Sequence, residues 1–315
     1  MRMLASDELS AEHKNAGGLL PEPQFCYSGG VKLAVYCQGD PSKPNIVLVH
    51  GYPDNSGVWN LLADYLVDQF YLIRYDVRGA GNSAVPADQN AYRLGRLQED
   101  LEAVTAQFCS QPKFHLVGHD WGSVQSWESV SCPRFQHKIL SYTSISGPCL
   151  DHMGHWVRQR LREKDGVRSM VKQFFRSWYI WFFHLPLLPA FLWRFVLGRY
   201  WSRSLYVFEG IETHGDIVAE RAQRRRDGVH GMALYRANCL PCFREPRQRT
   251  SEVPVHLVIP THDRFLGADL YSGISEWAPN TSVHHVSGGH WLPLSHPEEL
   301  ATLIVDFTRT VSLRA

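Results

Sequence analysis

The sequence lacks an excess of charge of either sign, and this absence narrows the classes of partner. Its 315 residues include 32 basic and 31 acidic side chains, for a formal net charge of +1. Without a net field, we expect the molecule as a whole to recruit neither nucleic acid nor anionic lipid. The length suggests one large domain or two small ones, and a hydrophobic content of 44% is enough for a sizeable core.

An apolar leader and a disulfide pattern are also missing. The first residues, MRMLASDELSAEHKNAGGLL, are polar, so we expect no signal peptide and interpret residues 1–23 as a mobile tail. Seven cysteines without a disulfide-like spacing favour reduced thiols and a cytoplasmic location. Cys239 and Cys242 have no second pair to complete a zinc site. The histidines likewise lack a set of partner ligands, so we expect no metal and no cofactor.

No apolar run is long enough and clean enough to predict an integral membrane segment. The strongest candidate, Phe174–Trp201, is long enough but is interrupted by charged or titratable residues and by prolines. These interruptions are Arg176, His184, Arg194, Pro186 and Pro189. We interpret the run as apolar helices that face a pocket, and docking at a membrane surface is the alternative.

What the sequence does contain is an alternation of short β-branched runs and longer helical patterns. The expected strands are Val31–Gln38 (in an N-terminal hairpin), Ile46–Val49, Tyr71–Tyr75, Phe114–Val117, Ile139–Thr143, Val255–Ile259 and Val283–Val286. The expected helices are Val58–Leu66, Leu94–Phe108, Gly122–Val130 and Glu298–Val311. This alternation predicts an α/β protein with a mostly parallel sheet. Residues 151–250 lack strand signals and predict an inserted helical cap, between core parts at 24–150 and 251–315.

The sequence Gly118-His119-Asp120-Trp121-Gly122 joins an expected strand to an expected helix. Its spacing is that of a tight nucleophile-bearing turn, with an aspartate in place of the usual serine. The glycines leave room beside the nucleophile, and the helix N-terminus favours an anion there. The alternative is an ordinary turn in which Asp120 caps the helix.

Two further motifs follow the strands on either side. His50-Gly51-Tyr52-Pro53 comes after Ile46–Val49, and its turn can present the backbone N–H of Tyr52. Together with the N–H of Trp121, this group predicts an oxyanion hole. We interpret His50 as a structural residue that shapes the loop, and the segment 76–83 as a scaffold beneath the turn.

Two residues downstream complete a predicted triad. Asp263 follows the strand Val255–Ile259, and His290 lies in a glycine-rich loop after Val283–Val286. We therefore predict that His290 acts as the base and that Asp263 orients its ring. Asp269 or Glu276 are the alternative acids.

Together, HGYPD, DVRGAGNS, GHDWGS and GGHW resemble the epoxide hydrolase and haloalkane dehalogenase branch of the α/β-hydrolases, from about Gln24 to the C-terminus. The resemblance implies an eight-stranded sheet with an inserted cap. The strings SISGPCLDHMGHW, RSWYI, HGMALYRAN and GGHWLPLSHPEEL are most similar to the hydrolase half of bacterial fusions with a short-chain dehydrogenase. Since the sequence ends at Ala315, we expect no dehydrogenase domain here.

The resemblance also implies the leaving-group chemistry. Epoxide hydrolases protonate the opening ring with cap tyrosines, and the string LYRAN makes Tyr235 the first candidate. Tyr179 is the available second phenol, although Trp181 or Phe182 also fits that position. Tyr235 as a core tyrosine that only packs the cap is the alternative. We expect the substrate pocket to include Tyr52, Trp121, Trp178, Trp181 and Phe182.

These residues predict an epoxide hydrolase that forms a vicinal diol through an ester on Asp120. The expected partner is a small apolar epoxide, with no nucleic acid, and either a monomer or a homodimer. A haloalkane dehalogenase with the same three residues is the alternative, which Tyr52 disfavours because dehalogenases often carry asparagine there to hold the halide. A binding domain without turnover is a weaker alternative.

Overall fold

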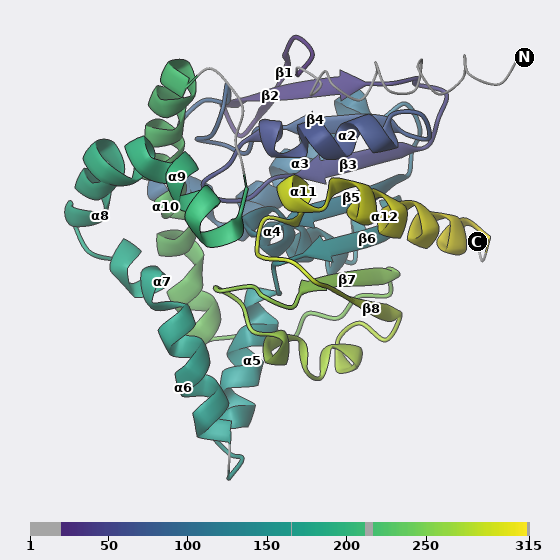
Figure 1. Ribbon diagram of the computed structural model, residues 1–315. Helices are drawn as coiled ribbons and strands as arrows, with labels where there is room; N and C mark the ends of the chain where they lie inside the picture. The colour runs from purple at the N-terminus through teal and green to yellow at the C-terminus, as the bar shows by residue number, and fades with distance from the viewer. Residues whose placement is uncertain (1–19, 165, 212–216, 314–315) are drawn as a thin grey trace, which may run out of the picture.

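The computed structural model describes residues 20–164, 166–211 and 217–313, so most of the predicted tail (residues 1–19) lies outside the described residues. Within them, one eight-stranded sheet has the order β1-β2-β4-β3-β5-β6-β7-β8 (Figure 1). β2 pairs antiparallel with β1 and β4, and the other neighbours are parallel. The predicted α/β architecture with a mostly parallel sheet is confirmed.

The strand bounds agree with the expected ones to within two residues at either end. The strands are β1 Gln24–Ser28, β2 Val31–Gln38, β3 Asn45–Val49, β4 Tyr71–Tyr75, β5 Phe114–His119, β6 Ile139–Ile145, β7 Val255–Pro260 and β8 Thr281–Val286. The antiparallel pairing of β1 with β2 confirms the N-terminal hairpin.

Helices cover both faces of this sheet. They are α2 Asn60–Leu66, α3 Leu94–Phe108, α4 Trp121–Val130, α5 Leu150–Arg160, α6 Gly166–Arg176, α7 Trp178–Phe183, α8 Leu188–Leu192, α9 Gly198–Glu209, α10 Ile217–Arg244, α11 Leu292–Ser295 and α12 Pro297–Ser312. In Figure 1, α2, α11 and α12 lie in front of the sheet, and α3 and α4 lie behind it.

Alternation along the central strands divides the core into two layers. Val47 and Val49 of β3 belong to the apolar cluster that contains α3 and α4. Ile46 and Leu48 belong to the cluster that contains α2 and α12. Because successive side chains of a strand point to opposite faces, a continuous apolar run is what a strand covered on both faces requires. This arrangement holds the carboxyl ends of the parallel strands at one edge.

The chain between β6 and β7 runs through α5 to α10. In Figure 1, α10 lies between the sheet and the outer helices α6, α7, α8 and α9. The chain leaves the helical conformation between α7 and α8, where Pro186 stands, and Pro189 lies in the first turn of α8. Among the described residues, no helix has both the length and the apolar content needed to cross a bilayer.

Candidate active site

Asp120 occupies a sharp turn between β5 and α4. Its backbone has φ 51° and ψ −122°, a conformation that disfavours a side-chain-bearing residue by about 1–3 kcal/mol. A Cβ on Gly118 would lie 2.6 Å from the Gly122 carbonyl oxygen, and a Cβ on Gly122 would overlap the Val49 carbonyl. Only glycine fits at these two positions, so the strained turn and its tight packing against β3 depend on the glycine spacing.

The carboxylate of Asp120 is held at both oxygens. The backbone N–H of Tyr52 donates to Oδ1 at 2.7 Å, and His290 Nε2 lies 3.3 Å from Oδ2. Trp121, the other predicted oxyanion donor, is the first residue of α4 and directly follows Asp120. The side chain of Asp120 remains 14% exposed, so a substrate atom can approach it.

His290 lies between the carboxylates of Asp120 and Asp263. Its Nδ1–H donates to Asp263 Oδ2 at 2.8 Å, while Nε2 faces Asp120. The other oxygen of Asp263 accepts hydrogen bonds from the backbone N–H groups of Phe265 and Leu266, at 2.8 and 3.0 Å. The orientation of the imidazole is thereby fixed from the Asp263 side.

Burial and neighbouring charges shift the pKa values of His290 and Asp263. Burial alone would lower the pKa of His290, but the neighbouring carboxylates Asp263 and Asp120 outweigh it and hold the pKa well above its usual range. Burial alone would raise the pKa of Asp263, but His290 and the two backbone donors bring it below its usual value. The carboxylates of Asp263 and Asp120 therefore favour the protonated form of His290 in the resting site.

Three neighbours position the loops of the site. His119 Nε2–H donates to the His290 carbonyl at 2.9 Å, and burial lowers the pKa of His119 to about 4, so this ring is neutral. Ser146 also donates to that carbonyl, at 3.3 Å. His50 accepts from the Val77 N–H through Nε2 and donates to the Gly51 carbonyl through Nδ1. His50 therefore ties two loops together beside Asp120.

The two candidate tyrosines come from different cap helices and meet above Asp120. Tyr235 of α10 and Tyr179 of α7 have ring centroids 5.8 Å apart, at 87°. The ring of Tyr235 also lies 4.8 Å from Trp121 and 5.3 Å from Tyr52. Burial, followed by the charge of Asp120, raises the pKa of both phenols well above the usual value. Both remain protonated at neutral pH and can donate.

The residues predicted to line the substrate pocket differ in their contacts and exposure. The rings of Tyr52 and Trp121 contact Tyr235, and Phe182 is partly buried between Trp178 and Phe183. Trp181 is 43% exposed and packs on Phe174 of α6, and its place in the substrate pocket stays a prediction. Residues 179 and 181 of α7 point to different sides of the helix.

A cavity of about 670 Å³ leads from the surface of the cap toward His290. It is lined by Phe175, Trp178 and Phe208 near its outer end and by Phe265 and Trp291 at its inner end. The rings of Phe265 and Trp291 lie 5.0 and 4.8 Å from the His290 ring. Trp178 is thus placed at the approach to the site.

Two acidic residues near the site were not predicted. Asp54 accepts a hydrogen bond from Trp291 Nε1 at 2.8 Å, and burial raises its pKa to about 6. Glu209 of α9 lies against Gly289, where a Cβ would overlap its carboxylate, and burial raises the pKa of Glu209. Asp54 lies within the motif HGYPD, which offered a signal for it. Glu209 reaches the site only through the folding of the cap.

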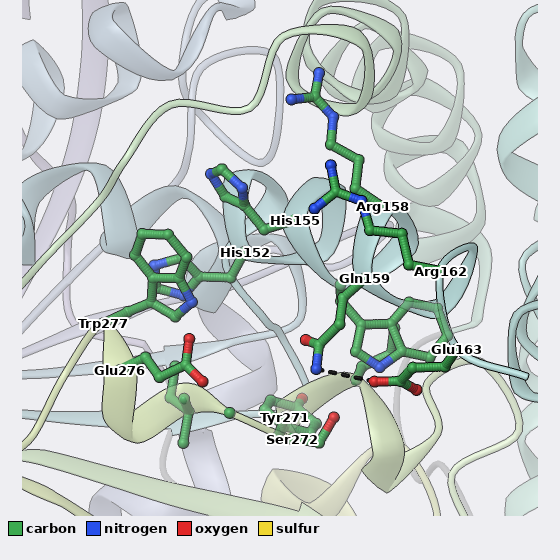
Figure 2. Close-up of a pocket in the computed structure, with 14 residues that line it drawn as sticks. His152, His155, Arg158, Gln159, Arg162, Glu163, Tyr271, Ser272, Glu276 and Trp277 are labelled. Atoms are coloured by element: carbon green, nitrogen blue, oxygen red, sulfur yellow. Dashed lines mark hydrogen bonds between the residues drawn. The ribbon is translucent and has the colours of Figure 1, made fainter. Parts of the chain in front are cut away.

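The alternative acids belong to a different region. Glu276 lines a separate cleft of about 380 Å³ between α5 and the segment that follows β7 (Figure 2). Asp269 accepts a hydrogen bond from Arg160 at 2.8 Å. Trp277 in this cleft stacks on His152 and His155. Neither Asp269 nor Glu276 is the partner of His290.

The chain is similar to known proteins in both sequence and fold. A family described as "alpha/beta hydrolase fold" matches residues 44–297. "Probable oxidoreductase EphD" of Mycobacterium bovis is 32% identical over 289 residues, covering 88% of this chain and 48% of that protein. "Epoxide hydrolase 3" of Xenopus tropicalis is 26% identical over 300 residues, with coverages of 89% and 75%. The chain thus spans about half the length of the first of these relatives.

Among solved structures, an epoxide hydrolase from Bacillus megaterium in complex with an inhibitor superposes with a TM-score of 0.76. The two sequences are 21% identical, and the match covers 91% of this chain and 100% of that one. At this identity the likeness concerns the fold. The family match, the sheet order and the turn at Asp120 agree, and the chain belongs to the alpha/beta hydrolase fold family.

Proposed function

We propose that this protein hydrolyses an epoxide to a vicinal diol through a covalent ester on Asp120. The observation that carries the proposal is the pair of phenols, Tyr179 and Tyr235, side by side next to a carboxylate that already faces a histidine. A carboxylate nucleophile suits displacement at a saturated carbon, and phenols supply the proton that an opening epoxide needs.

In the first step, a carboxylate oxygen of Asp120 attacks a ring carbon of the epoxide. The bond between that carbon and the ring oxygen breaks, and its electron pair goes to the oxygen. Tyr235 or Tyr179 donates a proton to this oxygen, so the leaving group is a neutral hydroxyl and one tyrosine is left as phenolate. The product of this step is a hydroxyalkyl ester of Asp120.

In the second step, His290 takes a proton from water, and the resulting hydroxide adds to the carboxyl carbon of Asp120. The N–H of Tyr52, already 2.7 Å from Oδ1, and that of Trp121 stabilise the oxyanion. Collapse breaks the bond between this carbon and the ester oxygen, and the proton on His290 goes to the departing diol. The proton of the regenerated carboxyl group passes to His290, which restores the resting site.

Charge explains how a protonated His290 becomes a base. In the resting site, Asp263 and Asp120 together hold the pKa of His290 high. Forming the ester removes the charge of Asp120, so the pKa of His290 falls and its proton passes to the phenolate left by the first step, which frees the imidazole to act as a base. Asp263 stays ionised and stabilises the imidazolium that forms as water is activated.

The proposed substrate is an epoxide with an apolar substituent, since aromatic side chains dominate the cavity that approaches His290. All seven cysteines are free thiols, and burial raises the pKa of six of them. This supports a cytoplasmic location as part of the proposal.

The relatives support this reaction over the alternative. The printed names of the Xenopus and Bacillus megaterium proteins state an epoxide hydrolase. A haloalkane dehalogenase needs donors to a halide but no proton donor, and two protonated tyrosines beside Asp120 are a poor substitute for an asparagine amide.

The direct test is turnover of two substrate panels by the purified chain. We expect aryl and alkyl epoxides to give vicinal diols, with chromatography as the measurement, and haloalkanes to release no halide. Halide release without diol formation would replace the proposal by dehalogenation. Turnover of neither panel would favour a binding domain that retains the fold.

A further inference from the structure

The outer helices of the cap expose an unusual amount of apolar surface. Of twenty-four large apolar side chains exposed in the described residues, sixteen lie between Val167 and Phe208, on α6 to α9 and their connections. We call the exposed surface of residues 166–208 the cap face. In Figure 1 these helices lie along the left side of the molecule, on the side of α10 away from the sheet. Exposed apolar patches of this kind mark interaction sites.

The exposed side chains are arranged as amphipathic stripes with aromatic clusters. On α6, Val167, Val171, Phe174 and Phe175 repeat at intervals of one and two helical turns. Rings that are exposed also pack on one another: Phe174 lies 5.8 Å from Trp181, and Phe191 lies 4.8 Å from Phe195. The apolar surface is therefore organised across neighbouring helices.

The exposed charges of the cap face are all positive, and Glu209, which follows the face at the end of α9, is partly buried. Residues 166–208 contain six basic side chains and no aspartate or glutamate, although the whole chain is balanced at 32 to 31. Five of the six (Arg168, Lys172, Arg194, Arg199 and Arg203) are exposed. A positive electrostatic field, which the molecule as a whole lacks, is therefore present on this face.

We propose that the cap face docks on the surface of an anionic lipid bilayer. Aromatic and aliphatic side chains that insert into the interface, with lysines and arginines that meet the headgroups, are the combination that such a surface recognises. Each cation near an anionic bilayer contributes about fivefold to partitioning. The helices lie on the membrane and do not cross it, in agreement with their length and their interruptions.

A second copy of the chain is a poorer occupant of the same face. Two copies that met through it would bring cations against cations, with no acidic side chain within residues 166–208 to neutralise them. An anionic bilayer supplies both an apolar interior and the opposite charge. Charge complementarity therefore favours an anionic bilayer over a second copy of the chain as the partner of the cap face.

The cavity toward His290 opens within the cap face. Phe175, Trp178 and Phe208 are exposed members of the face and also line the cavity. Its charged lining residues are Lys172, Arg176, Arg264 and Glu209. Docking directs the mouth of the cavity at the bilayer. It follows, resting on the proposed function, that the substrate class is an epoxide on a long apolar chain that enters from the membrane.

Binding to vesicles tests the docking without any reference to turnover. The full chain is mixed with phosphatidylcholine vesicles with or without phosphatidylserine, and bound protein is measured by sedimentation. We expect binding that requires phosphatidylserine and weakens with salt. Reversing two cations, Arg168→Glu with Arg199→Glu, should lower the partition coefficient at least about thirtyfold. Phe174→Ser with Phe191→Ser and Phe195→Ser should lower it at least about tenfold.

Matched variants away from the cap face provide the controls. Lys113→Glu and Tyr27→Ser change an exposed cation and an exposed aromatic on the sheet side and should leave binding unchanged. Circular dichroism and turnover of a short, water-soluble epoxide check that each variant is folded.

Three outcomes would overturn the proposal: no vesicle binding by the parent chain, equal loss in the control variants, or self-association that the phenylalanine variants abolish. Because binding is measured without substrate, vesicle binding with no turnover of any epoxide would remove the proposed function and leave the docking intact. Turnover without binding would do the reverse.

Discussion

Single residues decide which bond this site can break. Asp120 is strained on its turn, partly exposed, and met by one backbone N–H and one imidazole. His290 is held between two carboxylates whose charges set its proton affinity. Tyr179 and Tyr235 are the proposed proton donors to the leaving group, so the choice between reactions is tested there.

Replacing the phenols one at a time measures their role as acids. We expect Tyr235→Phe and Tyr179→Phe each to slow ester formation about 100-fold and the double variant about 10⁴-fold, since each removes a proton donor to the opening ring. Single-turnover kinetics with an aryl epoxide is the measurement.

Tyr92→Phe is the matched control for these variants. The hydroxyl of Tyr92 is buried without a hydrogen-bond partner, so its loss should leave the rate unchanged. Wild-type rates in both cap variants would mean that Tyr235 and Tyr179 only pack the cap.

The site residues that the sequence predicted are those that follow a recognisable strand. Asp120, Asp263 and His290 each follow β5, β7 or β8, and the carboxyl ends of parallel strands meet at one edge. Glu209 follows no strand and reaches His290 through the cap. Its place depends on packing between segments far apart in the chain, which no local pattern records.

Among the elements, the turn from β5 to α4 is constrained in both its backbone conformation and its packing. Two glycines allow β3, β5 and α4 to approach more closely than any side chain would permit. The sequence revealed this turn because glycine spacing is a local signal. It did not predict the individual helices of the cap, because apolar residues occur both in their buried contacts and on their exposed stripes.

A pair of glycine substitutions tests the constraint. Gly122→Ala should destabilise the protein by about 3 kcal/mol or more, because the new methyl group would overlap the backbone of Val49. Gly95→Ala in α3 meets nothing within 4 Å and should stabilise by about 0.5 kcal/mol. Urea unfolding followed by circular dichroism gives both values. Equal effects at the two positions would contradict the close approach.

At the scale of the whole molecule, buried and partly buried polar contacts connect the cap to the core. Asp227 of α10 accepts hydrogen bonds from the Gly81 N–H at 3.2 Å and from Asn55 at 3.4 Å, both in core loops. Arg247, beyond the end of α10, donates to Glu128 of α4 and Asp151 of α5, each at 2.8 Å. These ties fix the cap tyrosines over Asp120.

The burial of Asp227 predicts a pH dependence of stability. Burial raises its pKa to about 7, from 3.8. Between these values the folded protein keeps a proton that the unfolded chain has released, so the free energy of unfolding falls as pH rises through this window. Asp227→Asn should therefore be more stable than the parent at about pH 8, by about 2–4 kcal/mol, and similar at about pH 4. Denaturant titrations at both pH values check this, and a difference independent of pH would contradict it.

The central claim is that Asp120 is the nucleophile, and trapping its ester tests this most directly. His290→Gln removes the base of the second step and leaves the first step in place. After incubation of this variant with an epoxide that the parent hydrolyses, mass spectrometry should find the peptide containing Asp120 heavier by one substrate molecule. Asp120→Asn in the same background should carry no adduct. An adduct on another residue, or diol formation by the Asp120→Asn variant, would contradict the account.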